Sequence, residues 1–285
     1  MKDVTNAMRA HILTAAVPYI KQYTDQYVVV KYGGNAMIDE ELKKSVMKDL
    51  MLLQLVGVKV VLVHGGGPAI NSTLDAMKIE SRFANGLRVT DEATMDVVQM
   101  VLAGKVNKGL VADLTDLGGK AIGLCGVDGN MIQVHKQNDE LGYVGSIDTI
   151  DTSIIDDVIS RGYIPVISSI GMGADGKTYN INADTVAAKI AGALKAETMV
   201  AMTNIDGVLR DVHDPGSLIS KITMAEADQL KAEGIIAGGM IPKVDCCLEA
   251  IKSGAQKVFI INGEIPHAIL IELLTDEGLG TMFVK

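Results

Sequence analysis

The sequence has few cysteines and no long hydrophobic run. Cys125, Cys246 and Cys247 are the only cysteines in 285 residues, and two of them are adjacent. This pattern fits neither a disulfide framework nor a zinc site, so we expect a reducing, cytoplasmic environment. No apolar run reaches the ~18 residues of a membrane-spanning helix. The N-terminus lacks a signal peptide's apolar core, and Asp3 and Asp25 disfavour an acid-poor transit peptide.

Clustered positive charge is also absent. Asp and Glu number 35 against 26 Lys and Arg, the formal net charge is −9, and the basic residues are scattered. Such a surface repels nucleic acid and anionic lipid, so we expect neither as a partner. We find no low-complexity segment, internal repeat or Pro/Gly/Ser linker. With 48% hydrophobic and 21% charged residues, the composition is that of a globular protein whose ligand is a small molecule.

The chain alternates β-branched apolar runs with amphipathic segments. Runs that are apolar on both faces and separated by helix-length segments predict an α/β fold with a mostly parallel sheet covered on both sides. The expected strands span 27–32, 58–64, 120–125, 163–170, 197–203 and 257–262. Helical spacing is found at 40–56, 91–104, 148–161, 184–196, 223–233 and 243–254. Short alternating segments with glycine turns at 126–147 predict a hairpin on the sheet.

An additional segment precedes the first expected strand. Residues 3–23 have the spacing of a helix with one apolar side, and Pro18 in its later half is expected to bend it. The helix either packs on its own subunit or reaches a neighbouring one. The predicted fold does not require it, which leaves the second possibility open.

The stretch Gly171–Thr178, GMGADGKT, matches both the phosphate-loop pattern and the dinucleotide fingerprint. A phosphate loop must open directly into a helix, so that the loop amides and the helix N-terminus converge on the phosphates. Here Lys177 and Thr178 continue into Tyr-Asn-Ile-Asn, and helical spacing begins only near Asp184. Asp175-Gly176 is a strong turn signal. The sequence therefore predicts a hairpin at this place and neither kind of nucleotide loop.

Three other glycine-rich segments have a better context. Lys31–Gly34 and His64–Pro68 follow the first two strands, at the sheet edge where open α/β folds bind ligands. Gly238–Lys243 precedes a helix, and Lys243 near its start opposes the helix dipole, which makes it a candidate anion ligand. HGGG also occurs in esterases, but the G-x-S-x-G motif that they require is absent, so we expect a structural role for His64.

Together these segments resemble a known family. In chain order, six of them are similar to the motifs of the acetylglutamate kinase family, which belongs to the amino acid kinase superfamily: Lys31–Met37, Val63–Pro68, Asn85–Thr90, Tyr179–Asp184, Thr203–Val208 and Gly238–Lys243. The resemblance extends from about residue 17 to the C-terminus. It implies a three-layer αβα sandwich with an N-terminal oligomerisation and regulatory helix (1–24), a lobe binding N-acetyl-L-glutamate (25–194) and a lobe binding ATP (195–285).

The implied reaction is transfer of the γ-phosphoryl group of ATP to the side-chain carboxylate of N-acetyl-L-glutamate. The product is N-acetyl-L-glutamyl 5-phosphate, in the second step of arginine biosynthesis. A carboxylate is ionised at pH 7, so this nucleophile needs no general base. The reaction needs alignment of two anions and neutralisation of charge on the transferred group. That requirement agrees with glycine loops and lysines and with the lack of a catalytic His or Cys constellation.

The resemblance also implies roles for single residues. Lys31 and Lys243 would stabilise the transferred phosphoryl group, and Asp184 would position both lysines. Arg88 would bind the α-carboxylate of the substrate, for which a guanidinium is suited. Further substrate contacts would come from Gly66, Gly67 and Asn180, and phosphoryl contacts from Gly33 and Gly34. The ATP contacts would come from Asn204, Ile205, Asp206, Gly207, Leu209, Gly238 and Gly239.

Two features qualify these roles. Many family members have Asp at the position of Asn204, so the charge of that nucleotide contact would differ. Mg²⁺ would enter with ATP, bridging its phosphates, and we expect no dedicated metal ligands in the chain. Taken singly, Arg88 is also compatible with a surface ion pair, Asp184 with a helix cap, and Asn180 and Asn182 with turn residues.

The ends of the chain resemble the arginine-inhibited members of the family. The segment with Tyr19 and Lys21 is similar to the extra helix that joins homodimers into a homohexamer. Residues 267–282, with His267, Glu272 and Gly278, are similar to the segment that senses arginine as effector. The Glu272 carboxylate and carbonyls near Gly278 would hold a guanidinium group. The alternative is an ordinary last helix and edge strand.

Two rival functions remain at this point. One is a sister kinase acting on another carboxylate, such as an aminoadipate derivative. The other is a non-catalytic metabolite-binding regulator on the same fold. The presence of both Lys31 and Lys243 argues against the regulator, because a binding protein has little need for two cations directed at a phosphoryl group.

Overall fold

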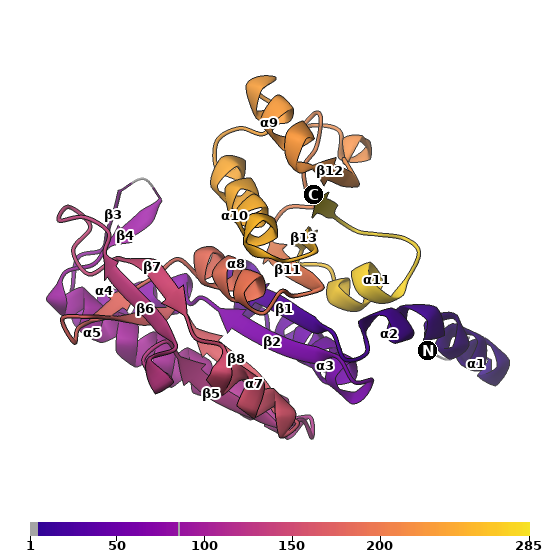
Figure 1. Cartoon of the computed structure of the whole chain (residues 1–285), viewed down its shortest axis with the longest axis horizontal. Helices are drawn as coiled ribbons and strands as arrows, with labels where there is room; N and C mark the ends of the chain where they lie inside the picture. Colours follow the sequence, from indigo (N-terminus) through magenta and orange to yellow (C-terminus); the bar gives the residue numbers. More distant parts are fainter. Residues whose placement is uncertain (1–4, 85) are drawn as a thin grey trace.

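The computed structural model describes residues 5–84 and 86–285. Residues 1–4 of the N-terminal segment and Asn85 of the motif before Arg88 lie outside the described residues. An eight-stranded sheet forms the middle layer, in the order β12-β14-β13-β11-β1-β2-β8-β5 (Figure 1). All neighbouring pairs are parallel except β13 with β14, which confirms the predicted mostly parallel sheet. The strands are β1 (Tyr27–Tyr32), β2 (Lys59–His64), β5 (Ala121–Cys125), β8 (Ile164–Ser168), β11 (Thr198–Thr203), β12 (Lys221–Thr223), β13 (Lys257–Asn262) and β14 (Thr281–Val284).

Helices cover both faces of this sheet and give three layers. Val29 of β1 faces one hydrophobic core, whereas Val28 and Val30 face the other. The first core is covered by α7 (Ser153–Ser160), α8 (Ala183–Ala193), α9 (Met224–Ala232) and α10 (Met240–Ser253). The second is covered by α3 (Glu40–Leu55), α6 (Asn107–Asp116) and α11 (Ala268–Leu274). Within the described ranges, no helix is long and apolar enough to cross a membrane.

A second sheet lies outside the three layers. It has four strands in the order β10 (Thr178–Asn180), β9 (Ile170–Gly173), β6 (Ile132–Lys136) and β7 (Gly145–Ile150). The predicted hairpin at 126–147 forms between β6 and β7, but in this second sheet instead of the central one. The prediction of one strand over 163–170 was also wrong. The chain leaves the central sheet after Ser168, and Ile170 pairs antiparallel with Asn180 in the second sheet.

Several helix boundaries differ from those predicted. The helix expected at 91–104 continues from α5 (Glu92–Gln99) through a π-helical segment, η2 (Met100–Val106), into α6. Gly104 does not end it, because buried side chains of η2 pack against α4 (Gly67–Met77). Helix α7 begins only at Ser153, since 148–150 belong to β7. Helix α10 begins at Met240, which leaves Lys243 in its first turn.

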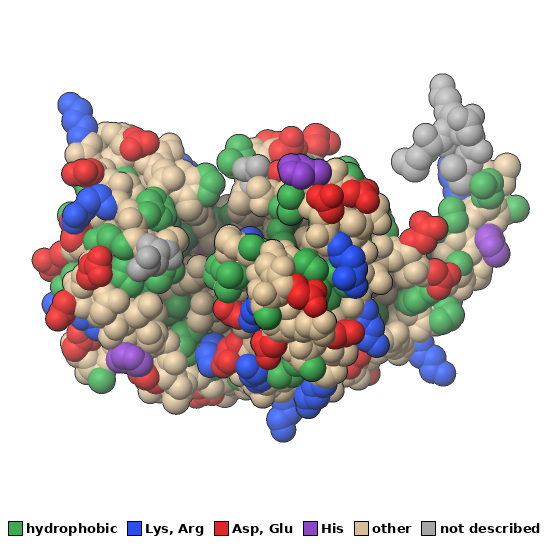
Figure 2. Space-filling model, turned by 90° about the horizontal axis from the view of Figure 1, so that it is seen from above, with side chains coloured by type: hydrophobic (Ala, Val, Ile, Leu, Met, Phe, Trp, Pro, Cys, Tyr) green, Lys and Arg blue, Asp and Glu red, His purple; other side chains and the backbone are tan. Residues whose placement is uncertain are grey.

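The N-terminal segment forms an arm beside the body of the protein (Figures 1 and 2). It consists of α1 (Asn6–Ala15) and α2 (Val17–Tyr23), with a break at Ala16. Pro18 lies in the first turn of α2, a position that tolerates proline, so the predicted bend is confirmed just before this residue. Tyr23 is buried in the second core, whereas α1 buries no side chain.

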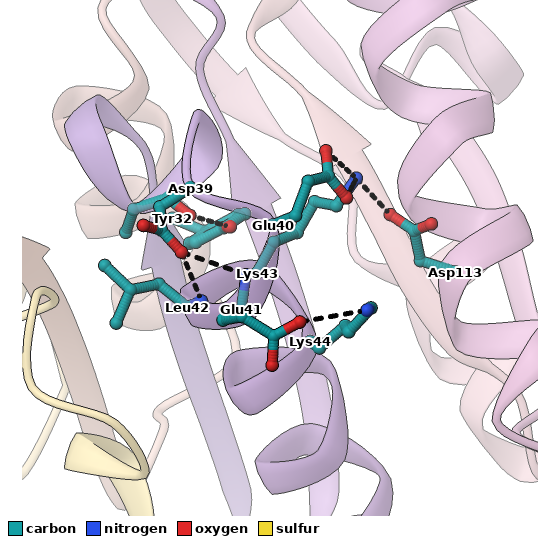
Figure 3. A network of polar contacts seen from close by, with 9 residues as sticks. Tyr32, Asp39, Glu40, Glu41, Leu42, Lys43, Lys44 and Asp113 are labelled. Carbon is teal, nitrogen blue, oxygen red and sulfur yellow. Dashed lines mark hydrogen bonds and ion pairs between the residues drawn. The ribbon is translucent and has the colours of Figure 1, made fainter.

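The loop after β1 rests on a polar network at the start of α3 (Figure 3). Asp39 caps this helix by accepting hydrogen bonds from the amides of Glu41 and Leu42, both at 2.9 Å. Lys43 lies 3.2 Å from Asp113 and so ties α3 to α6. The Tyr32 hydroxyl donates to the Ala36 carbonyl at 2.5 Å, which closes the segment after β1 on itself. This hydrogen bond thereby restrains the loop that contains Gly33 and Gly34.

The strand β3 (Arg82–Ala84) pairs antiparallel with β4 (Leu87–Val89) in a separate two-stranded sheet. In Figure 1 this hairpin lies near β6 and β7, on the opposite side of the molecule from α1. Figure 2, seen from above Figure 1, shows a hollow between this part and the part with α9 and α10.

Candidate active site

Three of the predicted site segments, those after β1, β2 and β11, lie at the carboxyl edge of the central sheet. The parallel strands β2, β1, β11 and β13 are neighbours, and each is followed at this edge by a loop that contains glycine. Backbone hydrogen bonds connect adjacent loops: the Gly65 amide donates to the Tyr32 carbonyl at 3.1 Å, and the Gly263 amide donates to the Thr203 carbonyl at 2.8 Å. Such an edge is where open α/β folds bind their ligands.

An ion pair between β1 and α8 lies in the middle of this edge. Lys31 Nζ is 2.9 Å from Asp184 Oδ1, and the two side chains are only 11% and 21% exposed. A Cβ atom on Gly33 would lie 3.5 Å from Lys31 Nζ, so the ammonium group lies beside the glycine loop. The cap of α8 is Asn182, which accepts from the Asp184 amide at 2.8 Å. The alternative of Asp184 as a mere cap is therefore wrong, and its carboxylate serves Lys31.

The loop after β2 is shaped by a buried histidine. The Asn107 side-chain amide donates to His64 Nε2 at 3.0 Å, so the ring carries its proton on Nδ1 and donates it to the Gly65 carbonyl at 2.9 Å. Burial lowers the pKa of His64 to about 4, so the ring is neutral at pH 7. This geometry is that of a structural residue. Asn107 was missed in the sequence, where nothing distinguishes it from an exposed helical asparagine.

Gly66 and Gly67 begin α4. Gly66 is the N-cap residue, α4 starts at Gly67, and Pro68 occupies its first turn. A Cβ atom on Gly66 would lie 2.6 Å from Leu102 Cδ2, so η2 leaves no room for a side chain there. The first-turn amides of a helix have no helical partners, and together with the helix dipole they favour an anion. This loop has the helix start that a phosphate or carboxylate site needs.

Arg88 and Asn180 come from the two small sheets. Arg88 on β4 is only 7% exposed, and its guanidinium donates to Ser81 Oγ and, at 2.6 Å, to Asn71 Oδ1. No carboxylate pairs with Arg88 in the described part of the chain, so the surface ion-pair alternative is wrong. Asn71 is one helical turn beyond Gly67 on α4, which places the guanidinium alongside this helix. Asn180 ends β10, and its Nδ2 donates to Thr90 Oγ1 at 3.3 Å.

The stretch GMGADGKT forms the hairpin that we predicted. The strands β9 (170–173) and β10 (178–180), which include its ends, pair with each other, and Gly176 at the turn has a φ of +76°. Lys177 Nζ donates to the Tyr143 hydroxyl at 2.9 Å, and α8 begins only at Ala183. The lysine and threonine of the pattern are therefore not at a helix N-terminus.

The predicted nucleotide segment lines a cavity of about 380 Å³. This segment is fixed by two hydrogen bonds from other elements. Asn262 Nδ2 donates to Asp206 Oδ1 at 2.7 Å, and the Val208 amide donates to Thr281 Oγ1 at 2.8 Å. The cavity walls include all of 204–209, together with Ala237 and Met240, which flank Gly238 and Gly239 in the sequence.

Lys243 lies in the first turn of α10, whose first residue, Met240, lines this cavity, but Lys243 is not among the lining residues. Helix α10 packs against α8, which carries Asp184. Among the described residues, Asp184 forms an ion pair with Lys31 and none with Lys243.

The residues predicted for the arginine site do not lie together. The Tyr19 hydroxyl donates to Asp276, and Glu272 accepts from the amides of Leu279 at 2.6 Å and Gly280 at 3.1 Å. Gly278 lies beside the same carboxylate, and burial raises the pKa of Glu272. His267, in contrast, faces α3, where its Nδ1 lies 2.6 Å from Asp49 Oδ1. Lys21 is exposed on α2.

Comparison with known proteins defines the class to which this fold and site belong. The model of the amino acid kinase family matches residues 26–262, and the chain belongs to that family. Within it, the chain belongs to the acetylglutamate kinases. It is 52% identical over 287 residues to the acetylglutamate kinase of Brachyspira hyodysenteriae, covering 100% of both chains. It is 54% identical over 275 residues to that of Clostridium kluyveri, covering 96% of this chain and 97% of the relative.

Solved structures share the fold. An N-acetylglutamate synthase from Neisseria gonorrhoeae, complexed with coenzyme A and N-acetyl-glutamate, superposes with a TM-score of 0.84 at 27% identity. The match covers 97% of this chain and 63% of the synthase chain. Carbamate kinase from Giardia lamblia, at a TM-score of 0.65 and 18% identity over 91% of this chain, shares the fold alone.

Proposed function

We propose that this chain transfers the γ-phosphoryl group of ATP to the side-chain carboxylate of N-acetyl-L-glutamate. The product is N-acetyl-L-glutamyl 5-phosphate, in the second step of arginine biosynthesis. The relatives named acetylglutamate kinase match the whole chain at about half identity, which supports this substrate. The observation that carries the chemistry is the Lys31–Asp184 pair, at 2.9 Å, beside two glycine loops at the carboxyl edge of the sheet.

The substrate lobe is proposed as residues 25–194. The α-carboxylate would bind the Arg88 guanidinium, which Asn71 and Ser81 already orient. The amides of Gly66 and Gly67 at the start of α4 would bind oxygen atoms of the reacting carboxylate and the phosphoryl group. Asn180 would add a further hydrogen bond to the substrate. The carboxylate attacks as it is, because it is ionised at pH 7 and has no proton to lose.

The nucleotide lobe is proposed as residues 195–285. ATP would occupy the cavity lined by 204–209, with its phosphates directed to Gly238 and Gly239 at the start of α10. Mg²⁺, carried by the phosphates, would neutralise part of their charge. Lys31 would stabilise the transferred phosphoryl group from the substrate side and Lys243 from the nucleotide side. Gly33 and Gly34 would donate backbone hydrogen bonds to the same group.

A hydroxylamine trap for acyl phosphates tests this function. The protein is incubated with ATP, Mg²⁺ and a panel of N-acyl amino acids, and the hydroxamate product is measured. We expect a hydroxamate from N-acetyl-L-glutamate, in an amount equal to the ADP released. No ATP-dependent product from this substrate would refute the proposal. A larger kcat/KM for an aminoadipate derivative would favour the sister kinase.

We further propose that arginine inhibits the enzyme and that homodimers assemble into a homohexamer through the N-terminal helix. Three observations support this proposal. Helix α1 buries no side chain of its own, although Met8, Ile12 and Leu13 on it are large and apolar. Tyr19 connects α2 to Asp276 in the segment after α11. Glu272 in the same region offers a carboxylate for a guanidinium ligand.

Deletion of residues 1–22 tests the assembly and the regulation together. We expect light scattering to show a hexamer for the full chain and a dimer for the deletion variant. The concentration of arginine that gives half-inhibition should rise in the deletion variant, while its activity without arginine remains. A full chain that behaves as a plain dimer would contradict the assembly, and an unchanged response to arginine would contradict the role of the helix.

A further inference from the structure

Arg88 and Asn180 belong to two different small sheets, and one short stretch of backbone connects them. The segment Leu141–Val144 runs between Thr90 and Asn180, and it pairs with both in parallel isolated bridges, Thr90 with Gly142 and Val144 with Asn180. Thr90 follows β4, two residues after Arg88. We name Thr90 together with Leu141–Val144 the substrate strut.

Backbone hydrogen bonds tie the strut on both sides. On the Arg88 side, the Thr90 amide donates to the Leu141 carbonyl at 2.9 Å, and the Tyr143 amide donates to the Thr90 carbonyl at 2.6 Å. On the other side, the Asn180 amide donates to the Tyr143 carbonyl at 2.9 Å. Tyr143 thus forms main-chain hydrogen bonds with Thr90 on one side and with Asn180 on the other.

The Thr90 side chain makes the same connection. A hydroxyl group has one hydrogen to donate and lone pairs to accept with. Thr90 Oγ1 donates to the Arg88 carbonyl at 2.9 Å and accepts from Asn180 Nδ2 at 3.3 Å. Thr90 is fully buried, so water does not replace either bond. Its hydroxyl therefore joins the backbone of one proposed substrate residue to the side chain of the other.

The strut has no space for a side chain at its centre, Gly142. Gly142 has a φ of +69°, and a Cβ atom on it would lie 2.3 Å from the Thr90 carbonyl oxygen. Leu141 and Val144 on either side are buried. A rigid backbone spacer between two ligand-binding side chains fixes the distance between the groups of the ligand that they bind.

Resting on the proposed function, we propose that Thr90 is a positioning residue that sets substrate length. It orients one N–H group of the Asn180 amide, so that the other N–H and the carbonyl oxygen face the substrate at a fixed distance from Arg88. The strut thereby selects the number of methylene groups between the α-carboxylate, bound by Arg88, and the rest of the substrate. Discrimination between homologous dicarboxylates is then a property of Thr90, which touches no ligand itself.

The test replaces Thr90 by valine and by serine. Thr90→Val keeps the shape but removes the hydroxyl, which leaves the Arg88 carbonyl and an Asn180 N–H without their partner. Thr90→Ser keeps the hydroxyl. Activity is measured with the N-acetyl derivatives of glutamate, of aspartate, which is one methylene shorter, and of aminoadipate, which is one methylene longer.

We expect Thr90→Val to raise the KM for N-acetylglutamate about tenfold, the cost of losing the buried hydrogen bond that orients the Asn180 amide. The kcat should stay within about threefold of wild type, because Lys31 and the glycine loops are unchanged, and the KM for ATP should not move. The preference for the glutamate derivative over both homologues should fall by a similar factor. Thr90→Ser should restore most of the KM and of the length preference.

Thr198→Val is the matched control. Thr198 is a fully buried threonine whose hydroxyl has no hydrogen-bond partner in the described residues, and it lies at the opposite end of β11 from the site. Its replacement should leave every kinetic constant unchanged. A Thr90→Val enzyme with wild-type KM and length preference would overturn the proposal. So would equal changes in Thr198→Val, or a Thr90→Ser enzyme as impaired as Thr90→Val.

Calorimetric binding of N-acetylglutamate in the absence of ATP separates this inference from the proposed function. If wild type binds the ligand but forms no acyl phosphate, the proposed function fails, and the Kd ratio between Thr90→Val and wild type decides the role of the strut. A ratio near ten supports it and a ratio near one overturns it. If wild type does not bind the ligand, both proposals fall.

Discussion

Two glycine-rich segments of this chain follow buried strands, and they end in different structures. After β2, His64–Pro68 passes directly into α4, with Gly66 as the cap. After β8, Gly171–Thr178 turns back on itself as the β9–β10 hairpin, and the next helix begins five residues later, at Ala183. The first segment presents unpaired helix amides to a ligand, whereas the second uses its backbone groups in its own pairing.

Lys31, beside the glycine loop next to His64–Pro68, and Lys177, inside the hairpin, differ in the same way. Lys31 is buried next to Gly33, and Asp184 fixes its ammonium group at 2.9 Å. Lys177 is exposed and donates to the Tyr143 hydroxyl. A cation that stabilises a transferred phosphoryl group has to be oriented in advance and partly shielded from water, because the interaction is then strongest. Burial and a fixed orientation of the lysine therefore matter more than a match to a sequence pattern.

Replacing Lys31 by alanine should have the largest effect on catalysis. It removes the oriented charge on the substrate side of the phosphoryl group, and loss of one such stabilising group lowers kcat by about 10³. The measurement is single-turnover formation of acyl phosphate with saturating ATP and N-acetylglutamate. A kcat within tenfold of wild type would show that Lys31 is a structural partner of Asp184 only.

Lys257→Ala is the matched control for Lys31→Ala. Lys257 pairs with Glu197 at 3.2 Å, with side chains 15% and 26% exposed, compared with 11% and 21% for Lys31 and Asp184. Lys257 starts β13, so it lies at the edge of the sheet opposite the site. The control should lose a similar amount of stability in thermal unfolding and keep its kcat.

Lys243→Ala should give the second largest effect, a fall in kcat of about 10². Its charge acts from the nucleotide side, so the KM for N-acetylglutamate should remain close to wild type. Lys252→Ala, in the last turn of the same helix, is the control and should leave kcat unchanged. If Lys243→Ala keeps full activity, the start of α10 is not part of the phosphoryl site.

The features that could be predicted from the sequence are those written in local patterns. Strands such as β1 and β2 show as continuous apolar runs, because both faces of a parallel sheet are buried. Asp175-Gly176 shows as a turn, and the glycine loops show where ligand-binding backbone lies. These patterns were enough to place Lys31 and Gly66 at one edge of the sheet, whereas the role of Asp184 beside Lys31 was predicted from the family resemblance.

The remaining features depend on contacts between distant segments. Asn107 and Thr90 are buried polar residues with partners far away in the chain, and although Thr90 ends the motif Asn85–Thr90, nothing in the sequence indicates these contacts. The break between β8 and β9 falls at Ser168 and Ser169, two small polar residues inside the otherwise apolar run 163–170, and both strands are buried, in different sheets. The partners of Arg88, Asn71 and Ser81, are likewise ordinary polar residues until the fold assembles them.

The free energy of unfolding should depend on pH through His64, in the glycine segment after β2, and not through the hairpin Gly171–Thr178. Burial lowers the pKa of His64 to about 4 from an ordinary value near 6.5, so the unfolded chain binds more protons between these values. Stability from this residue is complete above pH 6.5 and is lost as pH falls towards 4, up to about 3 kcal/mol. The reason is that a proton on Nε2 would face the Asn107 amide hydrogens.

The measurement is the free energy of unfolding of wild type and His64→Gln, by urea, at several values of pH. We expect the wild type to lose more stability than the variant on acidification. Parallel curves for the two proteins would contradict a neutral buried ring as the support of Gly65. The control is Tyr143→Phe, which removes the hydroxyl that Lys177 contacts in the hairpin and should give a curve parallel to that of wild type.

Replacing Lys177 by alanine should have the smallest effect, a change in kcat of at most about twofold, because contacts of exposed charged groups contribute little. Its partner Tyr143 does not depend on it. The backbone of Tyr143 is fixed by Thr90 on one side and by Asn180 on the other, so losing the lysine leaves the substrate strut in place. The comparison with Lys31→Ala is then direct, since both variants remove one ammonium group near a glycine-rich segment. A fall in kcat as large as that of Lys31→Ala would indicate that the phosphoryl group binds at GMGADGKT. A difference of about 10³ between the two variants would indicate that it binds beside Lys31.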